Sequence, residues 1–197
     1  MRALSILKKR NISFTIYDDI LPPYASVFYT DYEYYADIAR KHKHIHLIYD
    51  PTPTCLGLEK AILASFGKEK YNEVTVGIDP GPIPYYVVLG DGNILDYGCL
   101  NGDIDETIKN IVQCYPTSTT RIRIGSCYNG PELAIQIKES IPQAIVEIVD
   151  ENETSPRRHR YHHLMRKDIL DKIKPYRNKD AYAAIRIAFR KGIEIEV

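Results

Sequence analysis

A predicted strand that ends in a carboxylate is the feature that most restricts how this chain can fold. Residues 74–78 read as a buried strand, and Asp79 ends it, followed at once by a Pro-Gly turn. Two more strands are predicted directly afterwards, at 85–89 and 94–98, with an Asp-Gly turn between them. An acid at the end of a buried strand adds little to a core, but it can hold a metal ion. The function therefore depends on whether other carboxylates lie near Asp79.

The composition is that of a globular protein, with 44% hydrophobic and 26% charged residues. No apolar run reaches the roughly 20 residues that a membrane span needs, and the apolar stretch at the N-terminus is too short for a signal peptide. The four cysteines are scattered, at Cys55, Cys99, Cys114 and Cys127. We therefore expect buried free thiols in a cytoplasmic protein, without a disulfide framework or a zinc site.

The net charge of zero conceals blocks of opposite sign. Residues 1–73 carry +1, residues 74–156 carry −8 from 4 basic and 12 acidic residues, and residues 157–197 carry +7 from 12 basic and 5 acidic residues. An acidic block with strand-end carboxylates could hold a metal, and a basic block after it could contact phosphates. The alternative is that the two blocks neutralise each other or simply face water.

The first 70 residues predict a small α/β unit, because short apolar strands alternate with segments of helical periodicity. The expected elements are a helix at 3–10, strands at 13–17 and 25–29, a helix at 32–41, a strand at 46–49 and a helix at 56–66. Polar residues at 68–72 mark the expected domain boundary.

Residues 74–197 form the predicted second domain. After the three strands, the expected elements are a helix at 104–114, a strand at 121–125, a helix at 131–140, a strand at 144–149, and helices at 157–173 and 180–191. Three hairpin-connected strands followed by alternating helices and strands is the element order of the ribonuclease H-like fold, an α/β architecture with a mixed sheet. Its site is expected in the loops at one edge of the sheet.

Carboxylates occur at three places that this order brings to the same edge. Asp79 ends the first strand, Asp150 and Glu151 follow the last strand, and Asp180 begins the final helix. Small residues such as Ala184 allow that helix to approach the sheet closely. Converging carboxylates repel one another unless a cation lies between them. Ligation by oxygen alone suits Mg²⁺ or Mn²⁺ rather than zinc.

Three short motifs resemble those of RuvC- and YqgF-type nucleases of the ribonuclease H-like superfamily. They are Gly-Ile-Asp-Pro-Gly at 77–81, Asp-Glu-Asn-Glu-Thr-Ser at 150–155 and Asp-Ala-Tyr-Ala-Ala at 180–184. RuvC proteins carry a glutamate at the end of the fourth strand, where this chain has Gly-Ser-Cys at 125–127. The resemblance therefore favours the YqgF-like arrangement, in which the acid follows the last strand.

This resemblance covers residues 74–191 and implies a metal-dependent nuclease that cleaves branched or structured DNA or RNA. It implies Asp79, Glu151 and Asp180 as ligands of Mg²⁺ or Mn²⁺, with Asp150 assisting or substituting. Nucleic acid is then the expected partner, no membrane is expected, and a homodimer is compatible with the chain.

Two alternatives stay open. The first is a catalytically inactive module of the same fold that binds nucleic acid or protein through a basic helix at 157–179. Its predicted phosphate contacts are Arg157, Arg158, Arg160 and Arg166. The second is a phosphotransferase like the sugar kinases, for which the chain is too short to supply the two domains required.

Tyrosine is abundant in the first 70 residues. Half-buried packing explains this abundance better than the stacking of nucleic-acid bases. The residues are Tyr17, Tyr24, Tyr29, Tyr32, Tyr34, Tyr35 and Tyr49.

Overall fold

The computed structural model describes residues 2–151 and 179–196, which divide into two compact units. The first contains Met1–Lys70 together with Gln113–Pro116, and the second contains Tyr71–Val112 and Thr117–Val197. The helix expected at 157–173 lies outside the described residues. Within the described part of the chain, no helix is both long enough and apolar enough to cross a membrane.

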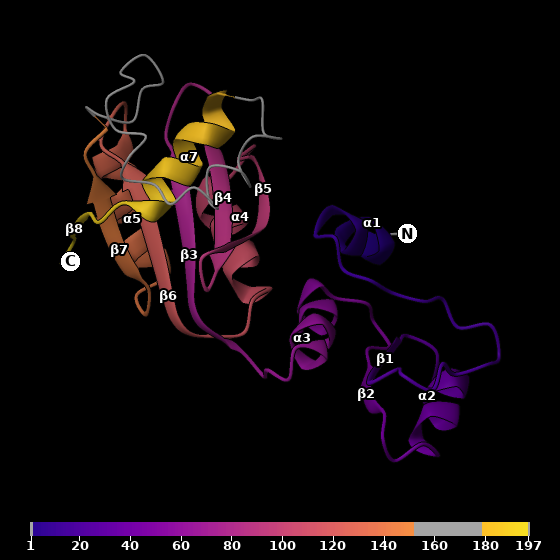
Figure 1. Ribbon diagram of the computed structural model, residues 1–197. Helices are drawn as coiled ribbons and strands as arrows, with labels where there is room; N and C mark the ends of the chain where they lie inside the picture. Colours follow the sequence, from indigo (N-terminus) through magenta and orange to yellow (C-terminus); the bar gives the residue numbers. More distant parts are fainter. Residues whose placement is uncertain (1, 152–178, 197) are drawn as a thin grey trace. The chain divides into compact units, whose positions relative to one another are not determined.

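The first unit consists of three helices and a two-stranded parallel sheet (Figure 1). Its elements are α1 (Arg2–Lys9), β1 (Val27–Thr30), α2 (Glu33–Arg40), β2 (His46–Tyr49) and α3 (Cys55–Ser65). The strand expected at 13–17 does not form. The alternating pattern there has no neighbouring strand to pair with, because β1 pairs only with β2. Tyr17 instead packs edge-on against the rings of Phe28 and Tyr35.

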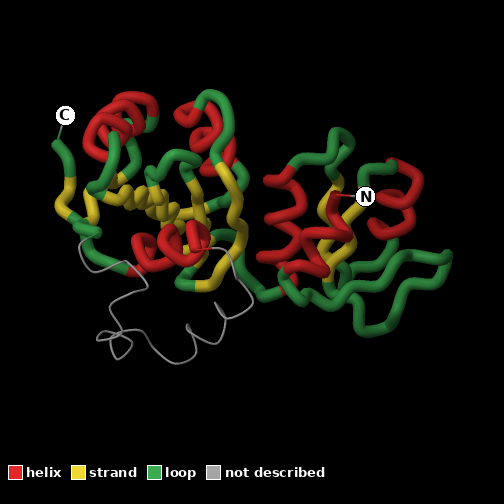
Figure 2. The backbone as a smooth tube through the Cα atoms, turned by 90° about the horizontal axis from the view of Figure 1, so that it is seen from above, coloured by secondary structure: helices red, strands yellow, loops and turns green. Residues whose placement is uncertain are grey.

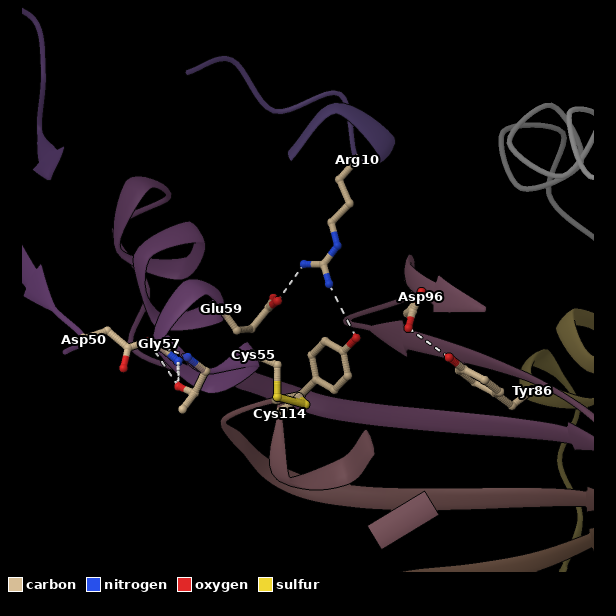
Figure 3. Close-up of a disulfide and its surroundings, with 10 residues drawn as sticks. Arg10, Asp50, Cys55, Gly57, Glu59, Tyr86, Asp96 and Cys114 are labelled. Carbon is tan, nitrogen blue, oxygen red and sulfur yellow. Dashed lines mark hydrogen bonds and ion pairs between the residues drawn. A yellow bond between two sulfur atoms is a disulfide. The ribbon is translucent and has the colours of Figure 1, made fainter. Parts of the chain in front are cut away.

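A disulfide between Cys55 and Cys114 corrects the expectation of free thiols (Figure 3). Cys55 begins α3, and Cys114 lies 59 residues further along the chain, at a Cα–Cα distance of 5.1 Å. The two remaining cysteines, Cys99 and Cys127, are free but exposed rather than buried. Disulfides are typical of oxidising compartments and also occur inside the cells of hyperthermophiles. The cysteines therefore no longer support the cytoplasmic location.

A buried ion pair lies beside this disulfide (Figure 3). The guanidinium of Arg10 is 2.7 Å from the carboxylate of Glu59, and the two side chains are only 9% and 3% exposed. Arg10 also lies over the ring of Tyr115, at 5.8 Å from its centroid. Because both charges are withdrawn from water, each depends on the other for compensation.

The second unit is built on a six-stranded mixed sheet in the order β5-β4-β3-β6-β7-β8. Its elements are β3 (Tyr71–Asp79), β4 (Tyr85–Gly90), β5 (Asn93–Cys99), α4 (Ile104–Gln113), β6 (Thr117–Gly125), α5 (Gly130–Ser140), β7 (Ile145–Val149), α7 (Lys179–Phe189) and β8 (Ile193–Glu194). The first three strands are antiparallel neighbours, whereas β6 and β7 run parallel to β3. The predicted mixed sheet, a three-strand meander followed by alternating helices and strands, is confirmed. Strand β8, which pairs antiparallel with β7, was not expected.

Helices cover both faces of this sheet (Figures 1 and 2). Helix α7 packs across β3, β4 and β6, and the opposite face is covered by α4 and α5. Alternating side chains divide between the faces. Val74, Val76 and Ile78 of β3 are fully buried, while Gly77 meets α7. The α7 face is mixed, because α7 packs on apolar residues of β4, whereas Arg123 and Glu147 lie beneath it on β6 and β7.

Close packing between α7 and the sheet depends on small residues. A Cβ on Gly77 would lie 2.6 Å from the Cβ of Ala188 and would overlap the carbonyl oxygen of Ala184. Ala181, Ala184 and Ala188 are all buried against β4 in one apolar cluster. The alanines of α7 therefore allow the approach that the sequence predicted for them.

Candidate carboxylate site

Asp79 is the last residue of β3, on the face of the sheet that α7 covers. Side chains alternate along a strand, so Asp79 points to the same side as Gly77, which is in contact with α7. The Asp79 carboxylate is half-buried. Its neighbour Gly81 donates a backbone hydrogen bond to it. Asp79 is therefore held at the strand end and faces the first turn of the helix.

Glu151 follows β7 by two residues, and its carboxylate lies over the end of β6. A Cβ added to Gly125 would overlap Oε1 of Glu151. The same oxygen accepts a hydrogen bond from the backbone N–H of Cys127 at 3.0 Å. The backbone N–H of Glu151 in turn donates to Oγ of Ser126 at 3.4 Å. Glu151 therefore reaches across β6, from β7 towards β3, over a strand end without a side chain.

Asp180 lies in the first turn of α7 and is exposed. A carboxylate at this position is favoured by the unpaired N–H groups of the helix start. The charge of Asp180 acts on Asp79 and on Tyr85, which is paired with Asp79 across β3 and β4. The beginning of α7 consequently lies at the Asp79 end of the sheet.

The charges of Glu151 and Asp180 act on the carboxylate of Asp79. Burial raises the pKa of Asp79 from 3.8 to about 6, and the nearby charges of Glu151 and Asp180 add to the increase. The hydrogen bond from Gly81 acts in the opposite direction. Residues 79, 151 and 180 come from β3, the end of β7 and α7. The charges of two of the predicted acids, Glu151 and Asp180, thus reach the third, Asp79.

Asp150 occupies a different environment from Glu151. It is exposed, and its backbone carbonyl accepts a hydrogen bond from Arg190 at 3.1 Å. Its charge is not among the causes that raise the pKa of Asp79. The sequence left open which of these two acids faces Asp79, and the geometry favours Glu151.

Cys127 lies beside this site but is poorly suited to act as a nucleophile. Although the residue is exposed, partial withdrawal of its thiol from water raises the pKa of the thiol, and the charge and hydrogen bond of Glu151 raise it further. A thiol whose pKa is raised is less ionised at neutral pH and therefore reacts more slowly. Its backbone N–H, by contrast, has a clear structural part in holding Glu151.

In the side-chain conformations of the structure, the described carboxylates do not form a complete metal-binding site. Across residues 2–151 and 179–196, no group of three or more His, Cys, Asp or Glu side chains has the geometry to hold a metal ion. The donor set nevertheless has the oxygen chemistry that Mg²⁺ and Mn²⁺ prefer. A bound cation would relieve the repulsion between Asp79 and the charges of Glu151 and Asp180, which contributes to the raised pKa of Asp79.

No known family model matches this chain, and no curated protein does either. The strand order and the carboxylates are therefore the features that bear on function.

Two features of this region were missed by sequence reasoning. From the sequence, Gly125 was noted only because the glutamate of RuvC proteins is missing at the end of this strand. In the structure, the glycine leaves the space that the side chain of Glu151 occupies. An ionic network also covers the sheet beneath α7, in which Arg121 and Arg123 both pair with Glu147. The alternating Arg-Ile-Arg-Ile sequence in β6 was the available signal, because it places two cations on one face.

The predicted phosphate-binding residues Arg157, Arg158, Arg160 and Arg166 lie outside the described residues.

Proposed function

We propose that the second unit is a metal-dependent nuclease with a ribonuclease H-like fold, which hydrolyses phosphodiester bonds in structured or branched nucleic acid. The observation that carries this proposal is the position of Glu151, over the end of β6 beside Asp79, together with Asp180 in the first turn of α7. Asp79 has its pKa raised to about 6 by burial and by the charges of Glu151 and Asp180. Such an arrangement is costly for stability alone, and it is typical of functional sites.

The strand order adds support. An antiparallel meander, β3 to β5, is followed by β6 and β7, which run parallel to β3 on its other side. This is the arrangement that the resemblance to RuvC- and YqgF-type nucleases implies. In that arrangement the acids at the ends of β3 and β7 lie at one edge, with the first turn of α7 beside them.

Each acid has a distinct part in the proposed site. Asp79 and Asp180 would hold Mg²⁺ or Mn²⁺ together with Glu151. Cys127 and Gly125 orient Glu151, the former through its backbone N–H and the latter by leaving space. When bound, the metal supplies activation of water and stabilisation of the leaving oxygen. Above a pH of about 6 the Asp79 carboxylate is ionised and available as a ligand.

The alternative is a non-catalytic module that binds nucleic acid or protein through the basic segment at 157–179. It is favoured by the lack of a closed metal cage among residues 2–151 and 179–196. The two functions differ in one respect that can be measured, because only the first cleaves nucleic acid.

The test is cleavage of a labelled four-way junction, a single-stranded DNA and a structured RNA with Mg²⁺ or Mn²⁺. We expect Asp79→Asn to abolish cleavage, since a neutral amide is a weak ligand for these ions. Glu132→Gln is the matched control, because Glu132 is an exposed acid in the first turn of α5. Cleavage that persists in Asp79→Asn would overturn the proposal. Salt-sensitive binding without cleavage by the wild type would favour the alternative.

A further inference from the structure

The first unit carries an exposed surface that is both aromatic and acidic, and the proposed nuclease chemistry makes no use of it. Residues 11–39 contain eight aromatic residues and five acids, and they contain no Lys, Arg or His. An ordinary stretch of globular protein mixes charges of both signs. A segment with aromatic rings and only negative charge is therefore a candidate for binding something positive.

The rings form one connected group. Tyr35 lies at its centre, with edge-on contacts to Tyr17 at 5.3 Å, Tyr32 at 5.6 Å and Tyr34 at 5.5 Å between centroids. Tyr32 and Tyr34 are nevertheless 60% and 62% exposed. Contacts among the rings restrict their rotamers before any ligand binds, so less conformational entropy is lost when a ligand packs on them than on isolated side chains.

Acidic side chains without ion pairs flank these rings. Glu33 and Asp37 are both paired with Arg40, at 2.6 Å and 2.5 Å. Asp18, Asp19 and Asp31 are exposed and form no ion pair with any described residue. Burial is the largest cause of the raised pKa of Tyr17. The charges of Asp19 and Asp18, which lie nearby, raise it further. The negative charge therefore lies at the rings themselves.

We infer that this acidic aromatic surface, defined by Tyr17, Asp18, Asp19, Asp31, Tyr32 and Tyr34, binds an arginine- or lysine-rich peptide segment of a partner protein. A guanidinium or ammonium group is attracted to the face of a tyrosine ring, and neighbouring carboxylates strengthen the attraction. Arginine also stacks flat on aromatic rings and forms paired hydrogen bonds with carboxylates. The surface offers both partners side by side.

The same charges argue against nucleic acid as the ligand of this surface. Tyrosine rings can stack on bases, but proteins that use such stacking combine it with a positively charged groove for the backbone. Here phosphates would approach Asp18, Asp19 and Asp31 with no basic residue between positions 11 and 39. Repulsion would offset the gain from stacking.

The test is fluorescence anisotropy of a labelled peptide of alternating arginine and glycine, titrated with the full chain at about 50 mM salt, where exposed charges are weakly screened. A peptide of alternating glutamine and glycine is the neutral comparison. The first variant combines Asp18→Asn, Asp19→Asn and Asp31→Asn, and the second combines Tyr32→Ser and Tyr34→Ser. The matched controls are Glu69→Gln and Phe66→Ser, an exposed acid and an exposed ring of the same unit.

We expect each variant of the surface to weaken binding of the arginine peptide by roughly tenfold, and each control to bind as the wild type does. All substitutions are at exposed positions, and unchanged circular dichroism would show that the unit stays folded. The inference is overturned if the wild type does not bind the arginine peptide, or if both variants bind it unchanged. It is also overturned if labelled oligothymidylate binds and loses affinity in the tyrosine variant.

Discussion

The carboxylate of Glu151 occupies the space above Gly125 into which any other residue would place its Cβ. This relationship joins the ends of β6 and β7 and turns Glu151 towards Asp79. It also explains why a strand that ends in glycine can belong to a carboxylate site: the acid arrives from the next strand along the sheet.

Gly125→Ala should displace Glu151 and lower the stability of the second unit. The new methyl group would overlap Oε1 of Glu151 and lie 3.0 Å from Cδ1 of Ile187. We expect a loss of about 1–3 kcal/mol in the free energy of unfolding, as for other overpacked sites, and loss of metal-dependent cleavage. Chemical denaturation measures the first effect. Gly81→Ala is the control, because its Cβ would lie at an ordinary 3.9 Å from Asp79 Oδ1; equal losses in both variants would contradict the prediction.

The stability of the second unit should fall as the pH rises from about 4 to about 6. Asp79 has a pKa raised from 3.8 to about 6, so the folded state holds its proton more tightly than the unfolded state does across this window. Allowing for solvent screening at this partly exposed group, the penalty above the window is about 1–2 kcal/mol. Asp79→Asn should remove this penalty, and its melting temperature should exceed that of the wild type at pH 8. A pH dependence that is identical in the two proteins would refute the explanation.

Mg²⁺ or Mn²⁺ should stabilise the wild type through the same carboxylates. A cation that binds the folded state alone raises the melting temperature by an amount that grows with the logarithm of its concentration once this exceeds the dissociation constant, and here it would also relieve the repulsion around Asp79. We expect millimolar Mn²⁺ to raise the melting temperature of the wild type at pH 8 and to have little effect on Asp79→Asn or Asp180→Asn. Glu132→Gln should respond as the wild type does. An equal metal response in all four proteins would show that the ion binds elsewhere.

Gly77→Ala should separate α7 from the sheet. Its Cβ would lie 2.6 Å from the Cβ of Ala188 and would overlap the carbonyl of Ala184, which is backbone and cannot rotate away. We expect a loss of about 3 kcal/mol together with reduced metal binding, because Asp180 moves with the helix. Gly98→Ala, whose Cβ would meet the Tyr86 ring at 3.2 Å, should cost less. Denaturation curves of the two variants give the comparison.

Reduction of the disulfide should destabilise the first unit. The Cys55–Cys114 bond closes a loop between residues 59 positions apart, and such bonds typically contribute about 2–4 kcal/mol. Cys55→Ser should therefore lower the melting temperature, whereas Cys99→Ser should leave it unchanged, since Cys99 is free and exposed. Mass spectrometry after thiol alkylation under non-reducing conditions checks the bond directly. Four alkylated cysteines in the native protein would show that the bond is absent.

The amino-acid sequence by itself determined the local elements of the second unit. Alternating apolar residues and tight turns indicated β3, β4 and β5, and helical periodicity indicated α4, α5 and α7. These signals are local, because a strand or helix is specified by neighbours a few positions away. The acids at positions 79, 151 and 180 were found in the same way, from their places at the ends of such elements.

Tertiary structure decided everything that depends on which distant segments meet. It paired Cys55 with Cys114, left the segment at 13–17 without a partner strand, and placed Glu151 over Gly125. It also favoured Glu151 over Asp150 as the acid that faces Asp79. The spacing of residues along the sequence does not show which distant segments come into contact, because these contacts are set by tertiary packing, for example that of α7 on the sheet. The carboxylate at the end of β3 could be read from the chain, whereas its raised pKa exists only in the folded protein, where burial and the charges of Glu151 and Asp180 act on it.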